Sequence, residues 1–537
     1  MISENISEKN GYGNSPGWRD KLFACVTALF FFLLPLQTRW IVRAPLDHGV
    51  PYEWGTLSIY GVEIIGWVII AFGIIQMRNV KYKIKNVKSF WLLGFLTVFS
   101  FLSIAWAPDK LVAFQGAMVL LEGVILYSVV NAIYSPSPGL RPPSPAGRGQ
   151  GEGVVWALIS GAVAQSFLGI YQFLTQFSFA SKWLGMALHD PRALGTSVVE
   201  FADERWLRAY GGLPHPNVLG GFLVVALAMT VVMWQKSQKS QMLQEDAKIL
   251  PDKTTCGRMW FCQLALKVVV PILLTGIFFS FSRAAWIAAG GLLVYWVIGV
   301  LKIPSPQSSP TGRGGLIDNP SPIGRGEGEG QTVWSGRCYA LLITLYILFL
   351  AFAFRPLVFT RVASESRLEV KSRVERVEGL REAWMLIKKH PVLGVGMGNY
   401  TQAVARELRP GQPLYSYQPA HNVFLLIWAE LGIVGLFLFV TVLYCIARQA
   451  KFSILNFTFL ILLMSDHFLW TLPFGVLLFW GVMGLASNVV RPLPDGRQVL
   501  RSRKPRTPSE SLVADLSVGL QGLARLNPRT TANLIPP

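Results

Sequence analysis

The chain has 537 residues, of which 52% are hydrophobic and only 15% charged, and its mean hydropathy is +0.42. This composition excludes a string of soluble domains and is typical of a polytopic membrane protein. The formal net charge is +19, but the Lys and Arg residues concentrate in alternate loops and in the tail. That distribution indicates topology signals rather than a nucleic-acid surface. We therefore expect the lipid bilayer as a partner and no nucleic acid.

Apolar runs that can cross a bilayer recur along the chain, since a spanning helix needs about 20 such residues. Alternating strand patterns do not recur, which argues against a β-barrel. We predict an all-α fold class, a polytopic integral membrane bundle of about 12 transmembrane helices. The last two runs are short and could form one re-entrant pair. The runs lie at 21–37, 58–76, 89–106, 111–133, 154–175, 216–234, 264–281, 284–302, 336–357, 421–446, 452–467 and 471–488.

The positive residues also predict which side each loop faces. With twelve spans, the Lys- and Arg-rich second, sixth and tenth loops and the tail fall on one side, which is the cytoplasm. The long loops 176–215 and 358–420 then face outward, and long loops of this make-up are uncommon unless they serve a function. We predict a multi-pass protein of the bacterial inner membrane with its site facing the periplasm or exterior.

The predicted organisation follows from these sides. Low-complexity insertions near 135–153 and 303–333 fall in cytoplasmic loops, and we expect them to be disordered because their Pro, Gly and Ser residues cannot bury a core. The predicted parts are a cytoplasmic segment 1–20, nine spans over 21–357, an extracytoplasmic loop 358–420, three spans over 421–488 and a basic, disordered cytoplasmic tail 489–537.

The outer loop 358–420 is predicted to contain an amphipathic helix. Ser366 and Glu369 fit a capping box at its start, and Pro391 ends it. An apolar stripe follows helical spacing, and we expect it to lie on the outer membrane–water boundary. The stripe consists of Val370, Val374, Val377, Trp384 and Ile387.

Two arginines at span ends are candidate phosphate ligands. Arg208 lies in a glycine- and proline-rich bend before the sixth span, which Asn217 can cap, and Arg283 lies in the short turn after the seventh. A guanidinium presents a planar fork of donors that fits phosphate oxygens. The alternative for both residues is a side chain that only reaches to lipid headgroups.

His421 and Asn422 place an imidazole and a carboxamide at the start of a long apolar span. An ionisable side chain there is a functional-site hypothesis, and the alternative is a residue that merely caps the helix. Glu430 follows nine residues later, which puts it on the opposite face of a helix. We therefore expect Glu430 to pair elsewhere in the bundle rather than to orient His421, and Gly432 and Gly435 to permit close helix packing.

Several other site classes have no signal in the sequence. It contains no P-loop, no paired-histidine metal motif and no nucleophile-elbow serine. The glycine run 394–398 lacks the spacing of a dinucleotide site. We expect neither a metal ion nor another cofactor.

Taken in order, these segments resemble the O-antigen ligase family of bacterial envelope enzymes, which includes O-antigen polymerases and protein O-oligosaccharyltransferases. The resemblance covers about residues 20–490 and includes the long outer loop before the histidine. It rests on Arg208, Gly211, Pro216, Asn217, Ser282, Arg283, Arg376, the run 390–396, His421, Asn422, Glu430, Leu431 and Gly432.

The resemblance implies a metal-independent membrane glycosyltransferase of lipopolysaccharide and polysaccharide biosynthesis. Its donor would be a glycan on a polyprenyl diphosphate such as undecaprenyl diphosphate, and its acceptor a glycolipid, a glycan or a protein. His421 matches the essential histidine, a general base, and Arg208 and Arg283 match the essential arginines that hold the diphosphate. To substrate binding we assign Arg376, Asn422, Asn217, Tyr210 and Arg205.

Besides a non-catalytic scaffold for envelope assembly, two other functions stay open at this point. One is an O-antigen or exopolysaccharide polymerase of the same family, which differs in its acceptor. The other, of a different class, is a lipid or polysaccharide transporter or flippase, because arginines inside a bundle can also line a substrate path. Against a transporter, the polar residues gather on one face rather than at the midplane, and no inverted repeat is evident.

Overall fold

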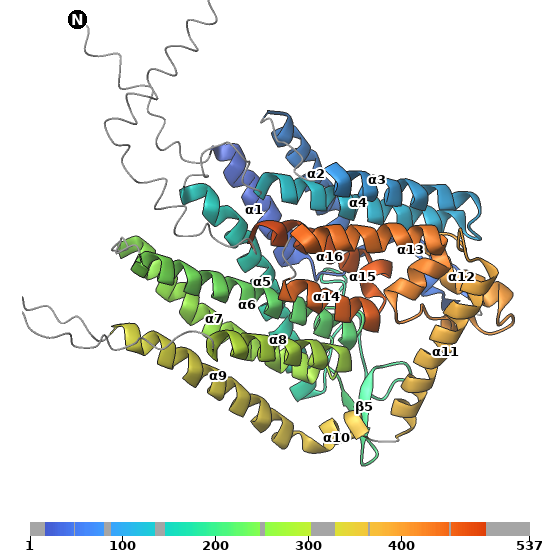
Figure 1. Ribbon diagram of the computed structural model, residues 1–537. Coiled ribbons are helices and arrows are strands. Elements are labelled where there is room, and N and C mark those ends of the chain that lie inside the picture. The colour runs from blue at the N-terminus through green and yellow to red at the C-terminus, as the bar shows by residue number, and fades with distance from the viewer. Residues whose placement is uncertain are drawn as a thin grey trace, which may run out of the picture. The chain divides into compact units, whose positions relative to one another are not determined.

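The computed structural model describes residues 17–47, 49–79, 87–134, 145–246, 253–301, 328–363, 366–449 and 453–489. Its elements lie in one compact unit, apart from the end of helix α6 after Ser237 (Figure 1). These residues are mostly helical, which confirms the predicted helical membrane fold class.

The first half of the chain forms α1 (Trp18–Leu33), α2 (Gly61–Asn79), α3 (Val87–Leu102), α4 (Lys110–Tyr134), α5 (Pro145–Thr175), α6 (Pro216–Asp246), α7 (Lys253–Phe279) and α8 (Arg283–Leu301). The second half forms α9 (Gly328–Ala353), α10 (Arg355–Ala363), α11 (Arg367–Lys389), α12 (Tyr400–Glu407), α13 (Val423–Gln449), α14 (Ile454–Ser465), α15 (Phe468–Thr471) and α16 (Pro473–Val489). Short 3-10 turns occur at Glu53–Gly55, Ser103–Ala105 and Leu414–Ser416.

Each predicted apolar run overlaps one of these helices. Within the described residues, six helices are long and apolar enough to cross a membrane, and they lie at 110–134, 151–175, 216–238, 283–301, 336–353 and 423–448. Shorter apolar helices lie at 61–77, 90–105, 265–279, 454–465 and 473–486. The count of twelve spans therefore stays a prediction.

Helix α6 is buried in the bundle. Its apolar window is 94% buried, as expected for a helix that is hydrophobic on all sides. Among the other described helices, α4 packs on α2 and α16, α5 on α1 and α7, α13 on α3 and α14, and α14 on α8. The window of α9 is only 17% buried, so α9 offers most of its apolar surface to the surroundings.

Short β-hairpins depart from the purely helical prediction. Strand β1 (Arg39–Arg43) pairs with β4 (Leu57–Tyr60), and β2 (Leu46–Asp47) pairs with β3 (Val50–Pro51), both between α1 and α2. Strand β5 (Val198–Phe201) pairs with β6 (Glu204–Leu207) inside the long loop before α6. These strands have two to five residues, too few for a strand period to show in the sequence.

The predicted amphipathic helix corresponds to α11, whose bounds agree with the prediction. The capping-box prediction was wrong for Glu369, because its carboxylate accepts a hydrogen bond from Arg361 instead of turning back to the N-cap. The apolar stripe divides: Ile387 is buried, whereas Val374 and Val377 are each 47% exposed. The place of this exposed half at the membrane boundary stays a prediction.

Helix α13 is broken at Gly432, where φ is 65° and ψ is −171°. The segment after α11 binds across this break: the N–H groups of Val395 and Gly396 donate to the carbonyls of Ala429 and Glu430 at 2.9 and 2.8 Å. A Cβ at position 432 would lie 1.9 Å from the Val392 carbonyl oxygen. Gly432 therefore permits close packing as predicted, but against this loop and not against another helix.

Parts of the predicted organisation lie outside the described residues. They include most of segment 1–20, most of both insertions and almost all of the tail 489–537. At the described ends of the insertions, α5 begins at Pro145 and α9 at Gly328, so residues 145–153 and 328–333 are helical.

Candidate active site

Arg208 lies between β6 and α6 and is only 4% exposed. Its Nε donates to the Ser280 carbonyl at 2.9 Å, and its Nη2 donates to Asn217 Oδ1 at 2.8 Å. Ser280 follows α7 and Asn217 is in the first turn of α6. The turn after α7 and the first turn of α6, which are distant in sequence, therefore hold this guanidinium in one orientation.

Among the described residues, the acceptors hydrogen-bonded to the Arg208 guanidinium are neutral, and the Glu369 carboxylate acts on it only at longer range. Burial lowers the pKa of Arg208 well below its ordinary value, and the positive charge of Arg361 lowers it further. Because burying an ion is costly unless an opposite charge compensates it, an anion beside Arg208 would be stabilised.

A second group of arginines surrounds the carboxylate of Glu369 in α11. Arg361 Nη1 lies 2.5 Å from Glu369 Oε1, and Arg283 Nη2 lies 3.6 Å from Oε2. Arg361 also donates through Nε to the Phe281 carbonyl at 2.8 Å. Glu369 is 3% exposed, so one buried carboxylate orients two guanidinium groups beside the turn between α7 and α8.

Arg376 follows two turns later on α11 and is half-buried. It lies within electrostatic reach of Asp466, Arg283 and Glu369. Among the described residues, no hydrogen-bond or ion-pair partner is assigned to its guanidinium. Its donors are therefore available to a ligand.

His421 lies just before α13, beside a carboxylate. Its Nδ1 is 3.6 Å from Asp466 Oδ1, and its ring centroid is 5.1 Å from that of His467. The Nδ1–Oδ1 separation is slightly too long for a hydrogen bond, although catalytic contacts often shorten when substrate binds. His467 also donates its backbone N–H to Asp466 Oδ1 at 2.7 Å, which fixes the carboxylate.

Asp466 lies between α14 and α15, outside both helices, and remains ionised. Burial alone would raise its pKa, but the contact with His421 and the neighbouring imidazoles outweigh burial and hold the pKa well below its usual range. Burial lowers the pKa of His467 to about 4 although Asp466 opposes this. At neutral pH, Asp466 is therefore an anion beside a neutral His467, and it can stabilise a protonated His421.

His215 connects the histidines with the arginines. Its Nδ1 accepts the backbone N–H of Asn217 at 3.1 Å, so Nε2 carries the proton that is donated to Ser197 Oγ at 2.9 Å. Burial and the charge of Arg208 lower its pKa to about 3. This neutral imidazole lies within electrostatic reach of Arg208 on one side and of Asp466 and His421 on the other.

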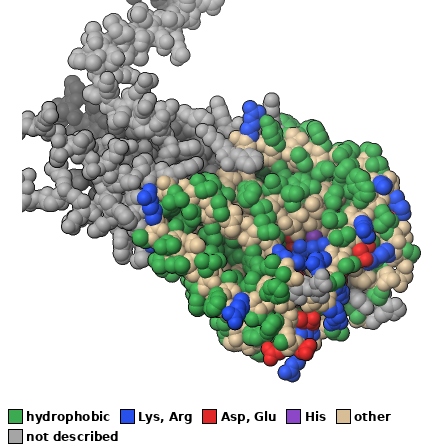
Figure 2. All heavy atoms as spheres, turned by 60° about the horizontal axis from the view of Figure 1, so that its bottom comes forward, with side chains coloured by type: hydrophobic (Ala, Val, Ile, Leu, Met, Phe, Trp, Pro, Cys, Tyr) green, Lys and Arg blue, Asp and Glu red, His purple; other side chains and the backbone are tan. Residues whose placement is uncertain are grey.

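Figure 2 shows the result at the surface: a histidine and a group of Lys and Arg side chains share a recess surrounded by hydrophobic side chains. The structure thus brings together Arg208, Arg283, Arg376 and His421, all singled out from the sequence. It adds residues that were not predicted to belong to the site, and these are Arg361, Glu369, Asp466, His467 and His215.

The remaining predicted substrate ligands have structural contacts. Asn217 holds Arg208, and Asn422 Oδ1 accepts the Leu425 N–H at 3.1 Å, which caps α13. Tyr210 Oη accepts the Ser197 N–H at 2.7 Å, and its ring stacks on His189. Arg205 donates to the Arg192 carbonyl and lies 3.7 Å from Glu200, so none of its described contacts is with the recess.

The prediction for Glu430 is confirmed, because its Oε2 accepts a hydrogen bond from Trp470 Nε1 at 2.8 Å rather than contacting His421. The partner of His421 is Asp466, which sequence analysis placed inside an apolar run. One signal could have revealed it: Asp466 and His467 are the only ionisable residues between 453 and 489. Ionisable residues in such runs are functional hypotheses by default.

His421, Asp466 and His467 could also hold a metal ion. Each offers one ligand atom, and these atoms lie within 4.8 Å of one another. Imidazole and carboxylate together suit divalent transition metals. The same three groups can also act as a general base with the carboxylate that orients it. The prediction of a metal-free site therefore needs its own experiment.

Residues 268–440 match the family model described as O-Antigen ligase. This region is similar to the O-antigen ligase family. It includes Arg283, Arg361, Glu369, Arg376 and His421, whereas Arg208 and Asp466 lie outside it. A comparison with curated proteins gives no match. Together with the apolar helices, the O-antigen ligase domain identifies a multi-pass membrane protein of polysaccharide and lipopolysaccharide biosynthesis.

Proposed function

We propose that this protein is a membrane glycosyltransferase that moves a glycan from a polyprenyl-diphosphate donor to an acceptor hydroxyl. The O-antigen ligase domain supports glycosyl transfer of the ligase or polymerase type. The finer proposal rests on the recess. There the guanidinium groups outnumber their carboxylate partner, Glu369, and they adjoin the His421 imidazole, which lies beside the Asp466 carboxylate.

The charge of the arginine group suits a diphosphate. Arg208, Arg283, Arg361 and Arg376 lie within electrostatic reach of one carboxylate, Glu369, so positive charge is in excess. Fixed donors of this kind stabilise negative charge as it develops on a leaving group. In this proposal Arg208, Arg283 and Arg376 bind the departing lipid diphosphate, and Arg361 helps Glu369 to position them.

The histidine group suits proton removal. With Nδ1 toward Asp466, Nε2 of His421 is left to accept the proton of the acceptor hydroxyl. The acceptor oxygen attacks the anomeric carbon, a new C–O bond forms, and the bond to the diphosphate breaks with its electron pair on the leaving group. The proton stays on His421, where Asp466 stabilises it. A single displacement inverts the anomeric centre.

We place this reaction at the periplasmic or exterior side of the bacterial inner membrane. The positive-inside distribution of the other loops supports that side, because the recess is built from the ends of α7, α13 and α14 that are away from the Lys- and Arg-rich loops. A ligase and a polymerase would share this chemistry and differ in the acceptor.

The test is glycan transfer by the purified protein in liposomes with a lipid-linked donor, an acceptor glycolipid and no ion gradient, followed by mass spectrometry. We expect transfer by the wild type and by His390→Gln, a histidine that pairs with Glu407 outside the recess, and none by a folded His421→Ala. Normal transfer by His421→Ala would reject its role. Movement of the donor across the bilayer without transfer would instead indicate a flippase.

A further inference from the structure

A second polar cavity, of about 120 Å³, adjoins the histidine group. Its walls come from the β-strand region after α1, from α4, from the start of α12 and from the α15–α16 connection. Aromatic and hydrogen-bonding side chains dominate the lining, and they include Trp54, Ser58, Tyr60, Gln115, Thr401 and Trp470.

Two buried polar atoms in this wall lack partners. Among the described residues, Trp54 Nε1 and Ser58 Oγ make no hydrogen bond, and Ser58 is only 5% exposed. Such orphaned groups cost free energy and are rare in native structures unless a ligand or water satisfies them. A water needs roughly 10–15 Å³ of such space, so the cavity has room for several waters or for a ring that displaces them.

The cavity is next to the proposed base. Trp54 packs edge-on against His467 with ring centroids 5.3 Å apart, and His467 packs on His421. Thr471, which lines the cavity, lies 2.8 Å from His467 Nδ1. Pro419, two residues before His421, lines it as well.

The arginines of the recess do not belong to this cavity. Among its described lining residues, Arg39 is the one arginine, and Arg208, Arg283 and Arg376 are absent. The cavity therefore suits a part of the substrate other than the diphosphate. Aromatic faces flanked by hydrogen-bonding groups fit a pyranose, whose C–H groups face above and below the ring and whose hydroxyls surround its edge.

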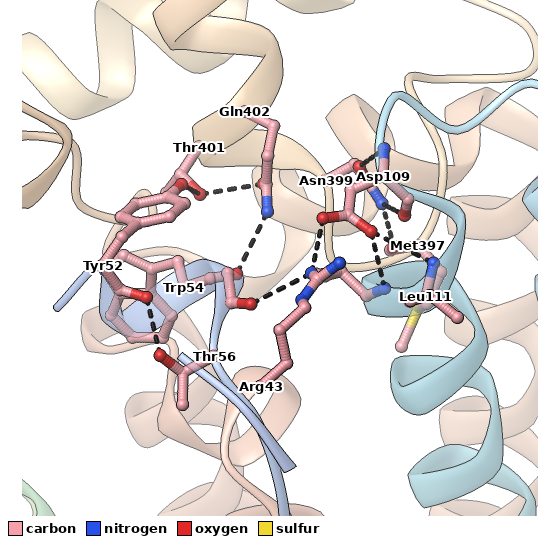
Figure 3. Close-up of polar contacts among 12 residues, drawn as sticks. Arg43, Tyr52, Trp54, Thr56, Asp109, Leu111, Met397, Asn399, Thr401 and Gln402 are labelled. Atoms are coloured by element: carbon pink, nitrogen blue, oxygen red, sulfur yellow. Dashed lines mark hydrogen bonds and ion pairs between the residues drawn. The ribbon is translucent and has the colours of Figure 1, made fainter. Parts of the chain in front are cut away.

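The wall that carries Trp54 is held rigidly (Figure 3). Gln402 Nε2 donates to the Trp54 carbonyl at 3.0 Å, and Tyr52 Oη bonds Thr401 Oγ1 at 2.6 Å. Arg43 links the same segment to Asp109 at 2.6 Å. Because these contacts within the chain fix the wall, binding there would cost little conformational entropy.

We propose that this cavity binds one sugar ring of the substrate and holds it beside His421. The inference rests on the proposed function, since the ring would belong either to the acceptor or to the glycan of the donor. The shared chemistry is a pyranose stacked on Trp54 or Trp470, with hydroxyls bonded to Trp54 Nε1 and Ser58 Oγ.

The first test measures binding without turnover. The probes are the methyl glycosides of glucose, galactose, mannose and N-acetylglucosamine. Saturation-transfer NMR measures their binding to the full chain in nanodiscs. Trp54→Phe keeps a ring but removes the N–H, Ser58→Ala removes the hydroxyl, and Trp183→Phe is the matched control at an indole that is 88% exposed. We expect saturable binding that Trp54→Phe and Ser58→Ala each weaken about tenfold and that Trp183→Phe leaves unchanged.

The second test determines whether the bound sugar ring belongs to the acceptor or to the donor. A raised KM for the acceptor in Trp54→Phe and Ser58→Ala assigns the cavity to the acceptor, and a raised KM for the lipid-linked donor assigns it to the donor, with kcat changed less than about twofold in both cases. His421→Ala should still bind the glycoside, so this inference and the proposed base can fail separately. Unchanged glycoside binding and unchanged KM for both substrates in two folded variants would overturn the proposal.

Discussion

Two buried carboxylates, Glu369 and Asp466, lie in one recess and have opposite surroundings. Glu369 is paired with two of the arginines in a group that remains positive in total, whereas Asp466 lies beside the imidazoles of His421 and His467. The first arrangement holds an anion in place, and the second takes up a proton. The difference teaches that the neighbours of a carboxylate determine its task, since the charge of both groups is the same.

The histidine side should show the largest effect on rate. His421→Ala and Asp466→Asn should each lower kcat by roughly 10²–10⁴-fold, because both variants disable the same base. The double variant should be no slower than the slower single variant, since residues that act as a unit are not additive. Initial rates of glycan transfer measure this cycle, and additive losses would show that Asp466 does not act through His421.

The arginine side should show the largest effect on stability. Glu369→Gln leaves Arg361, which is 5% exposed, without an anionic partner, and breaking such a buried pair costs about 3–5 kcal/mol. Thermal unfolding in detergent should show a lower Tm. The comparison is Glu375→Gln on the same helix, whose exposed pair with Lys371 should leave the Tm nearly unchanged. Equal Tm values for the two variants would contradict the structural role of Glu369.

Arg208→Lys should lower kcat by about a hundredfold, because a single ammonium cannot replace the fixed fork that stabilises the leaving group. Arg355→Lys serves as the control, since the contact assigned to the Arg355 guanidinium among the described residues is with the Phe352 ring. Transfer rates at saturating donor give the result. A change in KM alone would mean that Arg208 binds the donor without stabilising its departure.

The smallest effect is expected from a chelator. Incubation with EDTA should leave transfer unchanged, because the arginine group supplies the positive charge that a metal would otherwise provide. Loss of activity that zinc or manganese restores would show that His421, Asp466 and His467 hold a metal ion, and it would overturn the division of tasks between the two carboxylates.

The sequence predicted the helices well, because long apolar runs report burial locally. It also singled out Arg208, Arg283 and His421 as polar residues at helix ends, and the resemblance to the O-antigen ligase family added Arg376. It could not pair them, because pairing depends on which helix ends meet in space.

The missed residues have physical explanations of the same kind. Asp466 falls within the apolar run 452–467, so sequence analysis assigns it to a span. The ion pair of Arg361 with Glu369 joins two helices, α10 and α11, and such a pairing is not visible in the sequence. The short β-strands that flank Trp54 and precede Arg208 lack the length at which alternation becomes a signal.

The broken turn at Gly432 has a mechanical consequence. The chain that leaves α11 is bonded, backbone to backbone, across the break in α13, so the helix that presents Arg376 and the helix that begins after His421 share one anchorage. In the proposed mechanism, a displacement of either helix would therefore move the residue that binds the diphosphate and the proposed base together. A side chain at position 432 would clash with the Val392 carbonyl. It would separate the segment after α11 from α13 and would disturb the proposed diphosphate site and the proposed base together.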